Sequence, residues 1–305
     1  MQYILRGGGQ MFNVIRIYLI FFTPFLAITQ WPMNWQRYHR LPTIYNWMEQ
    51  LANDFPNLVK LNIIGITEEG RNIVVMKIGG GLPNRPAIFI EGGIHAREWI
   101  SPATVTFFVN ELVTNPANKD LLEYYDFFVL PVTNPDGYEY THNTDRMWRK
   151  NRGQSKTLLN IISNCKGVDL NRNFAYNWGE DLGLLSAQGG TPMPCLETYI
   201  GDKAFSEAES QAIKNFVLLN RNTIVAYLAY HSFGQKMLYP WSHTKDKVII
   251  YPPIHTGSFR NNAIFNFHNY KSYQTHQCPV ESHNLKDWII LTRLEKTSRT
   301  VMYLR

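Results

Sequence analysis

The sequence has only three cysteines in 305 residues, too few for a disulfide scaffold. A chain of this length can bury a sizeable hydrophobic core, so it needs neither a disulfide nor a metal merely to hold its fold. Cys165 and Cys195 flank one motif-rich stretch, and they either form a single bridge in an oxidising compartment or remain two buried thiols. Cys278 is left over, and we expect it to be unpaired.

Long runs of basic residues are also absent. The net charge is +6, but the lysines and arginines are scattered along the chain, so we expect no nucleic-acid partner. The sequence contains no Gly-x-Ser-x-Gly element, which argues against an α/β esterase.

A hydrophobic run long enough to span a membrane is missing as well. The apolar stretch at 17–28 is short for a span and contains Pro24. With Arg16 before it and small or polar residues after it, the segment 1–30 is typical of a secretory signal peptide. Secretion, with no stable membrane partner, follows from this interpretation. A signal anchor and a true start at Met11 are the alternatives.

The remaining chain shows no internal repeat, and helix-like segments alternate with strand-like ones. Apolar spacing predicts helices at 42–54, 101–112 and about 206–219. Apolar and β-branched runs predict strands at 59–66, 72–78, 87–90, 126–132 and 223–230. Local signals predict Ser101 as a helix cap, Ser206 with Glu209 as a capping box, and 134–137 as a turn. We therefore expect a single-domain α/β/α sandwich at 31–250, with a mixed, mostly parallel twisted sheet.

Metal-binding residue types follow two of the predicted strands. His95 and Glu98, three positions apart, come after the strand at 87–90, and His231 directly follows the strand at 223–230. A catalytic zinc takes three protein ligands of these types and keeps one position open. Sites in α/β sheets form outside the carboxyl ends of the strands. Taken singly, the His-x-x-Glu pair also fits a surface turn, and His231 also fits a packed core residue.

Two further clusters are polar and conspicuous. In the stretch 167–173, Asp169 is suited to orient a metal-bound imidazole, and Asn171 with Arg172 to hold a carboxylate. The stretch also fits a polar loop with self-capping asparagines. The basic stretch 146–150 fits a solvated edge anchored by a buried tryptophan.

Together these motifs resemble the pancreatic-type zinc carboxypeptidases, the A/B subfamily of the funnelins. The resemblance rests on seven stretches in the family's order and spacing, which are Pro86-Ala87-Ile88-Phe89-Ile90, Gly93-Ile94-His95-Ala96-Arg97-Glu98-Trp99-Ile100, Val132-Thr133-Asn134-Pro135-Asp136-Gly137-Tyr138, Trp148-Arg149-Lys150, Gly167-Val168-Asp169-Leu170-Asn171-Arg172-Asn173, Cys195-Leu196-Glu197-Thr198-Tyr199 and His231-Ser232-Phe233.

The resemblance implies a catalytic centre with one Zn²⁺ ion. Its ligands would be His95, Glu98 and His231. Asp169 would be the hydrogen-bond partner of the first histidine, and Arg149 would stabilise the oxyanion that develops during hydrolysis.

The resemblance also implies a substrate and a disulfide. Asn171 and Arg172 would grip the terminal carboxylate of a peptide, and Arg97 would contact the substrate beside the metal. Cys165 and Cys195 match the family disulfide. The implied protein is an enzyme that releases C-terminal residues from peptides and proteins. We expect a monomer, although the sequence leaves the oligomeric state open.

Beyond Trp241 the recognisable motifs end. We therefore expect 251–305 to be a divergent or truncated C-terminal region, in which the family's general-base Glu, capping Tyr and specificity residue find no counterpart; Glu295 is a weak candidate for the base. The mature domain would begin near Trp35, almost directly after the apolar stretch, so we expect either no activation segment or one missing from this sequence. The alternative function is a catalytically impaired, zinc-containing peptide-binding relative.

Overall fold

The computed structural model describes residues 33–80, 85–154, 164–179 and 189–234, together with the backbone of Met237–Leu238 and Thr300–Leu304. All of these residues belong to one unit, Pro32–Arg305. The expected signal peptide, Cys278 and Glu295 lie outside the described residues. So does most of the expected C-terminal region, of which only the strand at its end is described.

Seven strands form one mixed sheet in the order β1-β2-β4-β3-β5-β7-β6. Their bounds are β1 Val59–Ile66, β2 Asn72–Ile78, β3 Ala87–Glu91, β4 Asp126–Leu130, β5 Ile224–Tyr230, β6 Met237–Leu238 and β7 Thr300–Leu304. The pairs β3–β4, β3–β5 and β5–β7 are parallel, and the other three pairs are antiparallel. The parallel strands occupy the centre of the sheet.

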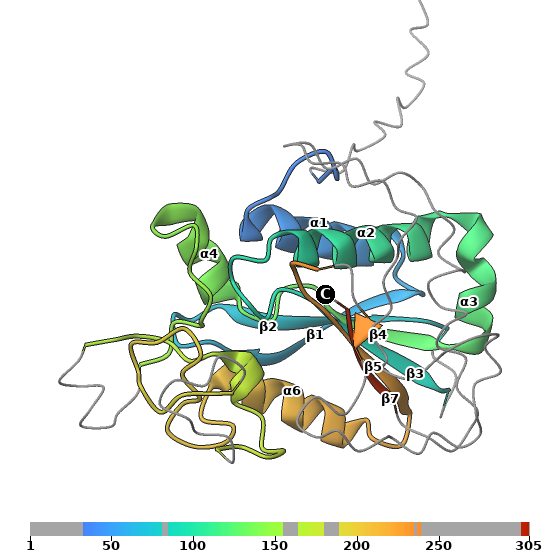
Figure 1. Cartoon of the computed structure of the whole chain (residues 1–305). Helices are drawn as coiled ribbons and strands as arrows, with labels where there is room; N and C mark the ends of the chain where they lie inside the picture. The colour runs from blue at the N-terminus through green and yellow to red at the C-terminus, as the bar shows by residue number, and fades with distance from the viewer. Residues whose placement is uncertain are drawn as a thin grey trace, which may run out of the picture. The chain divides into compact units, whose positions relative to one another are not determined.

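Helices cover both faces of this sheet. Their bounds are α1 Leu41–Asp54, α2 Ile100–Thr114, α3 Lys119–Tyr124, α4 Pro135–Asn143 and α6 Ala208–Leu219, with short 3₁₀ turns at Pro116–Asn118 and Leu170–Arg172. Figure 1 shows α1 and α2 over one face and α6 under the other. The expected α/β/α sandwich is therefore confirmed. No helix in the described part of the chain is long and apolar enough to cross a membrane.

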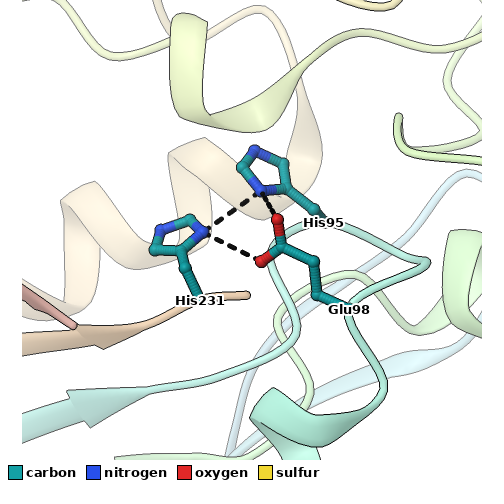
Figure 2. Close-up of side chains that lie close together, drawn as sticks. All are labelled: His95, Glu98 and His231. Atoms are coloured by element: carbon teal, nitrogen blue, oxygen red, sulfur yellow. Dashed lines mark hydrogen bonds and ion pairs between the residues drawn. The ribbon is translucent and has the colours of Figure 1, made fainter. Parts of the chain in front are cut away.

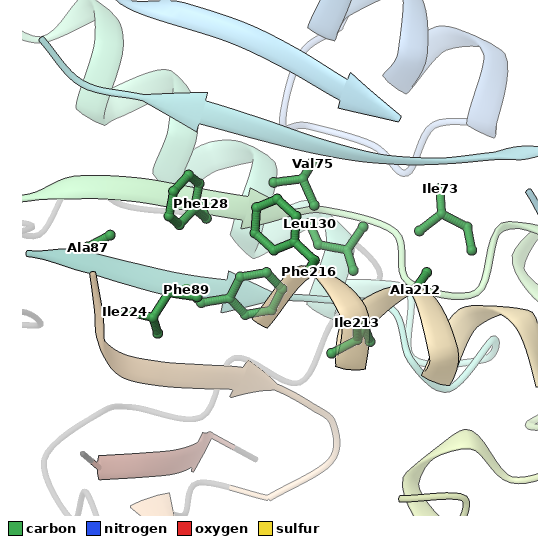
Figure 3. Packing of buried hydrophobic residues seen from close by; sticks show 10 residues of the cluster. All are labelled: Ile73, Val75, Ala87, Phe89, Phe128, Leu130, Ala212, Ile213, Phe216 and Ile224. Carbon is green, nitrogen blue, oxygen red and sulfur yellow. The ribbon is translucent and has the colours of Figure 1, made fainter. Parts of the chain in front are cut away.

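The hydrophobic core fills the space between the sheet and its helices. Strand side chains alternate between the two faces, so Ile73 and Val75 of β2 point toward α6, where they join Phe216 (Figure 3). On the opposite face Phe127 of β4 packs against Phe108 of α2, with ring centroids 5.7 Å apart. The inner strands β2, β3 and β4 are thus buried on both sides, which explains their continuous apolar runs.

Three local predictions were wrong. The segment 134–137 is no isolated turn: Asn134 caps α4 by accepting a hydrogen bond from Gly137 N, and Pro135 occupies the first turn of that helix. Ser101 lies inside α2, whose N-cap is Trp99. The predicted capping box of α6 does not form, because the N-cap is Glu207 and no side chain of its own caps the helix.

Tertiary contacts explain both serine errors. The hydroxyl of Ser101 bonds to backbone groups outside its helix. At the start of α6, the oxygen acceptor comes from Asn173, which takes hydrogen bonds from Glu207 N at 3.3 Å and Ser210 Oγ at 2.6 Å. The serine of α2 is thus engaged by distant backbone groups, and at α6 a distant side chain has replaced the local cap.

Candidate metal centre

The carboxyl ends of the parallel strands β3, β4 and β5 meet at one edge of the sheet. β3 and β5 run side by side up to Glu91 and Ala229. The loop that follows β3 carries His95 and Glu98, and His231 directly follows β5. These three side chains, which are remote in sequence, are therefore brought to the same place by the strand order.

Their ligand atoms converge in a buried cluster, with all three residues less than 9% exposed. His95 Nδ1 lies 2.9 Å from Glu98 Oε1, and His231 Nδ1 lies 3.0 Å from Glu98 Oε2. The two Nδ1 atoms are 3.1 Å apart. Figure 2 shows the three side chains pointing toward one another. One ligand atom from each lies within 4.8 Å of the others.

Asp169 fixes the proton on His95. Its Oδ1 lies 3.1 Å from His95 Nε2, and since a carboxylate accepts, Nε2 must carry the hydrogen. The lone pair of His95 is thereby placed on Nδ1, toward Glu98 and His231. Two imidazole nitrogens and a carboxylate oxygen form a donor set that suits zinc.

Both carboxylates of this cluster are ionised. Burial by itself raises the pKa of Glu98, but the close contacts with His231 and His95 outweigh burial and hold the pKa well below its ordinary range. Burial likewise opposes ionisation of Asp169, yet His95 and Arg149 hold its pKa well below the usual value. The charges are thus already in the form that a cation requires.

Arg149 connects Asp169 with the cluster. Its Nε and Nη2 donate to Asp169 Oδ2 at 3.0 and 2.9 Å. The third nitrogen, Nη1, lies 3.9 Å from Glu98 Oε1. Asp169 therefore holds the edge of the guanidinium that carries Nε and Nη2, while Nη1 faces the potential ligand atoms.

The other expected substrate residues are placed differently. Arg97 is engaged by Glu197, with Nη1–Oε1 and Nη2–Oε2 distances of 2.8 and 3.0 Å. Arg172 donates to Asn171 O at 3.1 Å, and no described carboxylate lies within salt-bridge distance of it. Of Arg97, Arg149 and Arg172, only Arg172 is without a carboxylate partner among the described residues, which leaves its guanidinium available for an anionic group.

Comparison of the sequence with models of protein families identifies the family that has this fold and site. The family model described as zinc carboxypeptidase matches residues 44–300, which is most of the chain. The chain belongs to the zinc carboxypeptidase family. The match extends past Trp241, where the recognisable motifs end, and it identifies the metal of this donor set as zinc.

Curated and structural relatives agree. The chain is 42% identical to a carboxypeptidase B of Astacus astacus over 215 residues, covering 70% of this chain and 67% of that protein. It is 47% identical to a carboxypeptidase B of Rattus norvegicus over 214 residues, covering 69% and 49%. Bovine thrombin-activatable fibrinolysis inhibitor, solved in complex with a tick carboxypeptidase inhibitor, matches with a TM-score of 0.62 and 37% identity over 70% of this chain and 67% of that chain. The matched part spans about half to two thirds of these relatives.

A disulfide closes the segment that carries Asp169 and Arg172. Cys165 and Cys195 are bonded, with their Cα atoms 5.1 Å apart. Lys150, next to Arg149, donates to the backbone oxygen preceding Cys195 at 2.7 Å. Burial lowers the pKa of Lys150 to about 8. The disulfide segment is thus tied to the loop that supplies Arg149.

Sequence reasoning missed one residue that organises the site. Asn134 is fully buried, and its Nδ2 donates to Ile94 O at 3.3 Å and to Lys150 O at 3.0 Å. It thereby joins the loop that carries His95 to Lys150, the residue next to Arg149. An asparagine directly before a proline and an acidic residue is a helix-start signal, and that signal was present in the sequence.

Proposed function

We propose that this chain is a metallocarboxypeptidase that hydrolyses the C-terminal peptide bond of peptides and proteins. The observation that carries the proposal is the convergence of His95, Glu98 and His231, with Arg172 in the 3₁₀ turn that Asp169 caps. The family assignment and the named carboxypeptidase relatives support the same reaction.

The metal would be held by His95 Nδ1, one or both oxygens of Glu98, and His231 Nδ1. Zinc bound there supplies a Lewis acid and lowers the pKa of a water molecule. Asp169 keeps the lone pair of His95 directed at the ligand position. Two histidines and one carboxylate leave a further position for water or substrate.

The substrate would be held by its free carboxylate. Arg172 offers a planar guanidinium that can bind a carboxylate with two parallel hydrogen bonds. The side-chain amide of Asn171 is hydrogen-bonded to no described residue, so it can add a further donor. Only a peptide with a free C-terminus satisfies both groups, which makes the enzyme an exopeptidase.

Arg149 would stabilise the negative charge that develops on the scissile carbonyl oxygen. Its Nη1 faces the ligand cluster, and its other nitrogens are held by Asp169. A donor fixed before the reaction is worth several kcal/mol at such a position. Arg97, held by Glu197 at the rim, would contact the substrate chain beside the metal. We assign the proton-accepting base to no described residue; Glu295 lies outside them.

Secretion is part of the proposal. The disulfide between Cys165 and Cys195 persists in oxidising compartments, and the apolar segment at 17–28 fits a secretory signal. Full-length protein expressed with this segment should appear in the medium of a eukaryotic cell culture with the disulfide formed.

The test of the reaction uses blocked dipeptides ending in Phe, Leu, Arg, Lys or Glu, with and without a zinc chelator. We expect release of the C-terminal residue that the chelator abolishes and added zinc restores. Matched substrates with an amidated C-terminus should not be cleaved, because they lack the carboxylate that Arg172 would bind. Absence of turnover by folded, zinc-loaded protein would contradict the proposal and leave the peptide-binding alternative.

A further inference from the structure

The hydroxyl of Ser101 links the two chain segments that carry the proposed metal ligands. Ser101 lies in the first turn of α2 and is only 2% exposed. Its Oγ accepts a hydrogen bond from Gly93 N at 2.9 Å and donates one to Tyr230 O at 2.6 Å. Gly93 lies two positions before His95, and Tyr230 lies directly before His231.

This hydroxyl occupies the place of the next hydrogen bond between β3 and β5. The amide of Ala87 faces β5, where it donates to Thr223 O, whereas the amide of Gly92 faces β4. Because strand amides alternate in direction, the amide of Gly93 faces β5 again. A parallel ladder continued in the same register would join Gly93 N to Tyr230 O directly. The hydroxyl is inserted between these two atoms.

Glycines make the insertion possible. A Cβ atom at Gly92 would lie 3.1 Å from Ser101 Oγ and 2.9 Å from Val105 Cγ2. At Gly93, φ is +67° and a Cβ would lie 2.9 Å from Pro102 Cγ. The start of α2 therefore approaches the end of β3 closely enough to place its hydroxyl between the strands.

We propose that Ser101 is a positioning residue that sets the separation of His95 and His231 by holding β3 and β5 apart where both ligands leave the sheet. The inference rests on the proposed metal site. The Ser101 hydroxyl contacts no metal-ligating atom, and the backbone amide of Ser101 donates to Glu98 O at 2.9 Å, a bond that a side-chain substitution leaves in place. An inserted hydroxyl lengthens the connection from one hydrogen bond to two, which spreads the strands.

Removing the hydroxyl gives this idea a specific signature. In Ser101→Ala the amide of Gly93 and the carbonyl of Tyr230 can pair directly, so the fold keeps a hydrogen bond at this position. The strands then close and His231 shifts relative to His95. A variant that folds well but binds zinc poorly is therefore expected. A purely structural serine would instead weaken the fold and leave zinc affinity of the folded protein unchanged.

The experiment measures the zinc dissociation constant by competition with a chromophoric chelator, and the visible absorption of the Co²⁺-substituted protein. For Ser101→Ala we expect a dissociation constant raised on the order of 10-fold to 100-fold and an altered cobalt spectrum. Ser101→Thr keeps the hydroxyl and should restore both. Thr114→Ala removes a hydroxyl from the other end of α2, where it donates to Asn110 O at 2.8 Å, and should change neither.

Each outcome is decisive. Folded Ser101→Ala protein with the wild-type dissociation constant and cobalt spectrum overturns the inference, as does an equal loss in Thr114→Ala. If the alanine variant does not fold, Gly92→Ala reports on the same contact, because its Cβ would lie 3.1 Å from Ser101 Oγ and crowd the hydroxyl. Unchanged zinc binding in that variant overturns the inference too. Wild-type protein that binds zinc without turnover contradicts the proposed function and leaves this test intact.

Discussion

At the scale of single residues, Asp169 collects the polar contacts of the centre. Its Oδ1 meets His95 Nε2 and Asn171 N, and its Oδ2 meets two nitrogens of Arg149. One fully buried carboxylate thus orients a proposed zinc ligand and the proposed oxyanion donor together. Changes at this position should affect metal binding and turnover at the same time.

The variant Asp169→Asn tests this. An amide can donate to His95 Nε2, which would move the imidazole proton to Nδ1, the atom proposed to bind zinc. We expect zinc affinity to fall on the order of 10-fold to 100-fold, measured by competition with a chelator. Asp136→Asn is the matched control: Asp136 is equally buried and paired with Arg71. Its zinc affinity should stay within about threefold of wild type, and a loss equal to that of Asp169→Asn would refute the specific role.

The sequence was sufficient to predict the site residues whose role follows from their position at the end of a strand. His95 and Glu98 stand three apart after a strand, and His231 directly ends another, so strand order alone brings them together. Ser101 and Asn134 were assigned only as a cap and a turn residue. Their partners are backbone groups of segments remote in sequence, and no pattern of side-chain types reports such contacts.

At the scale of elements, the start of α6 depends on Asn173. Its Nδ2 donates to Ile200 O at 2.9 Å and to Lys203 O at 3.1 Å, while its Oδ1 accepts from Glu207 N and Ser210 Oγ. One buried amide therefore caps the helix and holds the loop that leads into it.

Asn173→Ala should lower the free energy of unfolding by about 3 kcal/mol, because several buried polar groups lose their partners. Chemical denaturation measures this value. The matched control is Asn220→Ala at the other end of α6, where a part-buried amide donates only to Phe216 O and the loss should stay below about 1 kcal/mol. Equal losses would show that Asn173 has no special role.

Element positions were predictable because apolar periodicity reflects burial, and the bounds of β1 and β2 agree with it. The strand expected to reach Val132 ends at Leu130, since Pro131 cannot donate to the ladder. Helix starts were the weak point. The predicted caps Ser101 and Ser206 reflect the preferences of isolated segments. In the folded chain, tertiary hydrogen bonds override these preferences.

At the scale of the whole molecule, the buried carboxyl groups of Glu207 and Glu209 make the free energy of unfolding depend on pH. Glu207 and Glu209 share the amide of Asn151, whose Nδ2 lies 2.7 and 3.0 Å from their Oε2 atoms. Burial raises the pKa of Glu209 to about 8. The folded chain therefore holds a proton that the unfolded chain releases above its ordinary glutamate pKa.

Stability should fall as pH rises from about 4.5 to about 8, by at most roughly 1.4 kcal/mol per pH unit from this group. Glu209→Gln mimics the protonated form, so its loss of stability with pH should be smaller across the same window. Denaturation at a series of pH values measures this. The exposed Glu49→Gln should follow the wild-type curve, and a Glu209→Gln curve parallel to wild type would disprove the assignment.

The parallel pairing of β3 with β5 also has a consequence for biosynthesis. His95 and His231 are 136 positions apart, and the strand that delivers the second histidine lies beside the strand that delivers the first. A nascent chain on the ribosome can form α1, β1 and β2 early, but it lacks one of the proposed ligands until β5 and His231 have emerged. With this ligand set, zinc capture would be a late step of folding, and the metal would have to be available in the compartment where the finished chain folds.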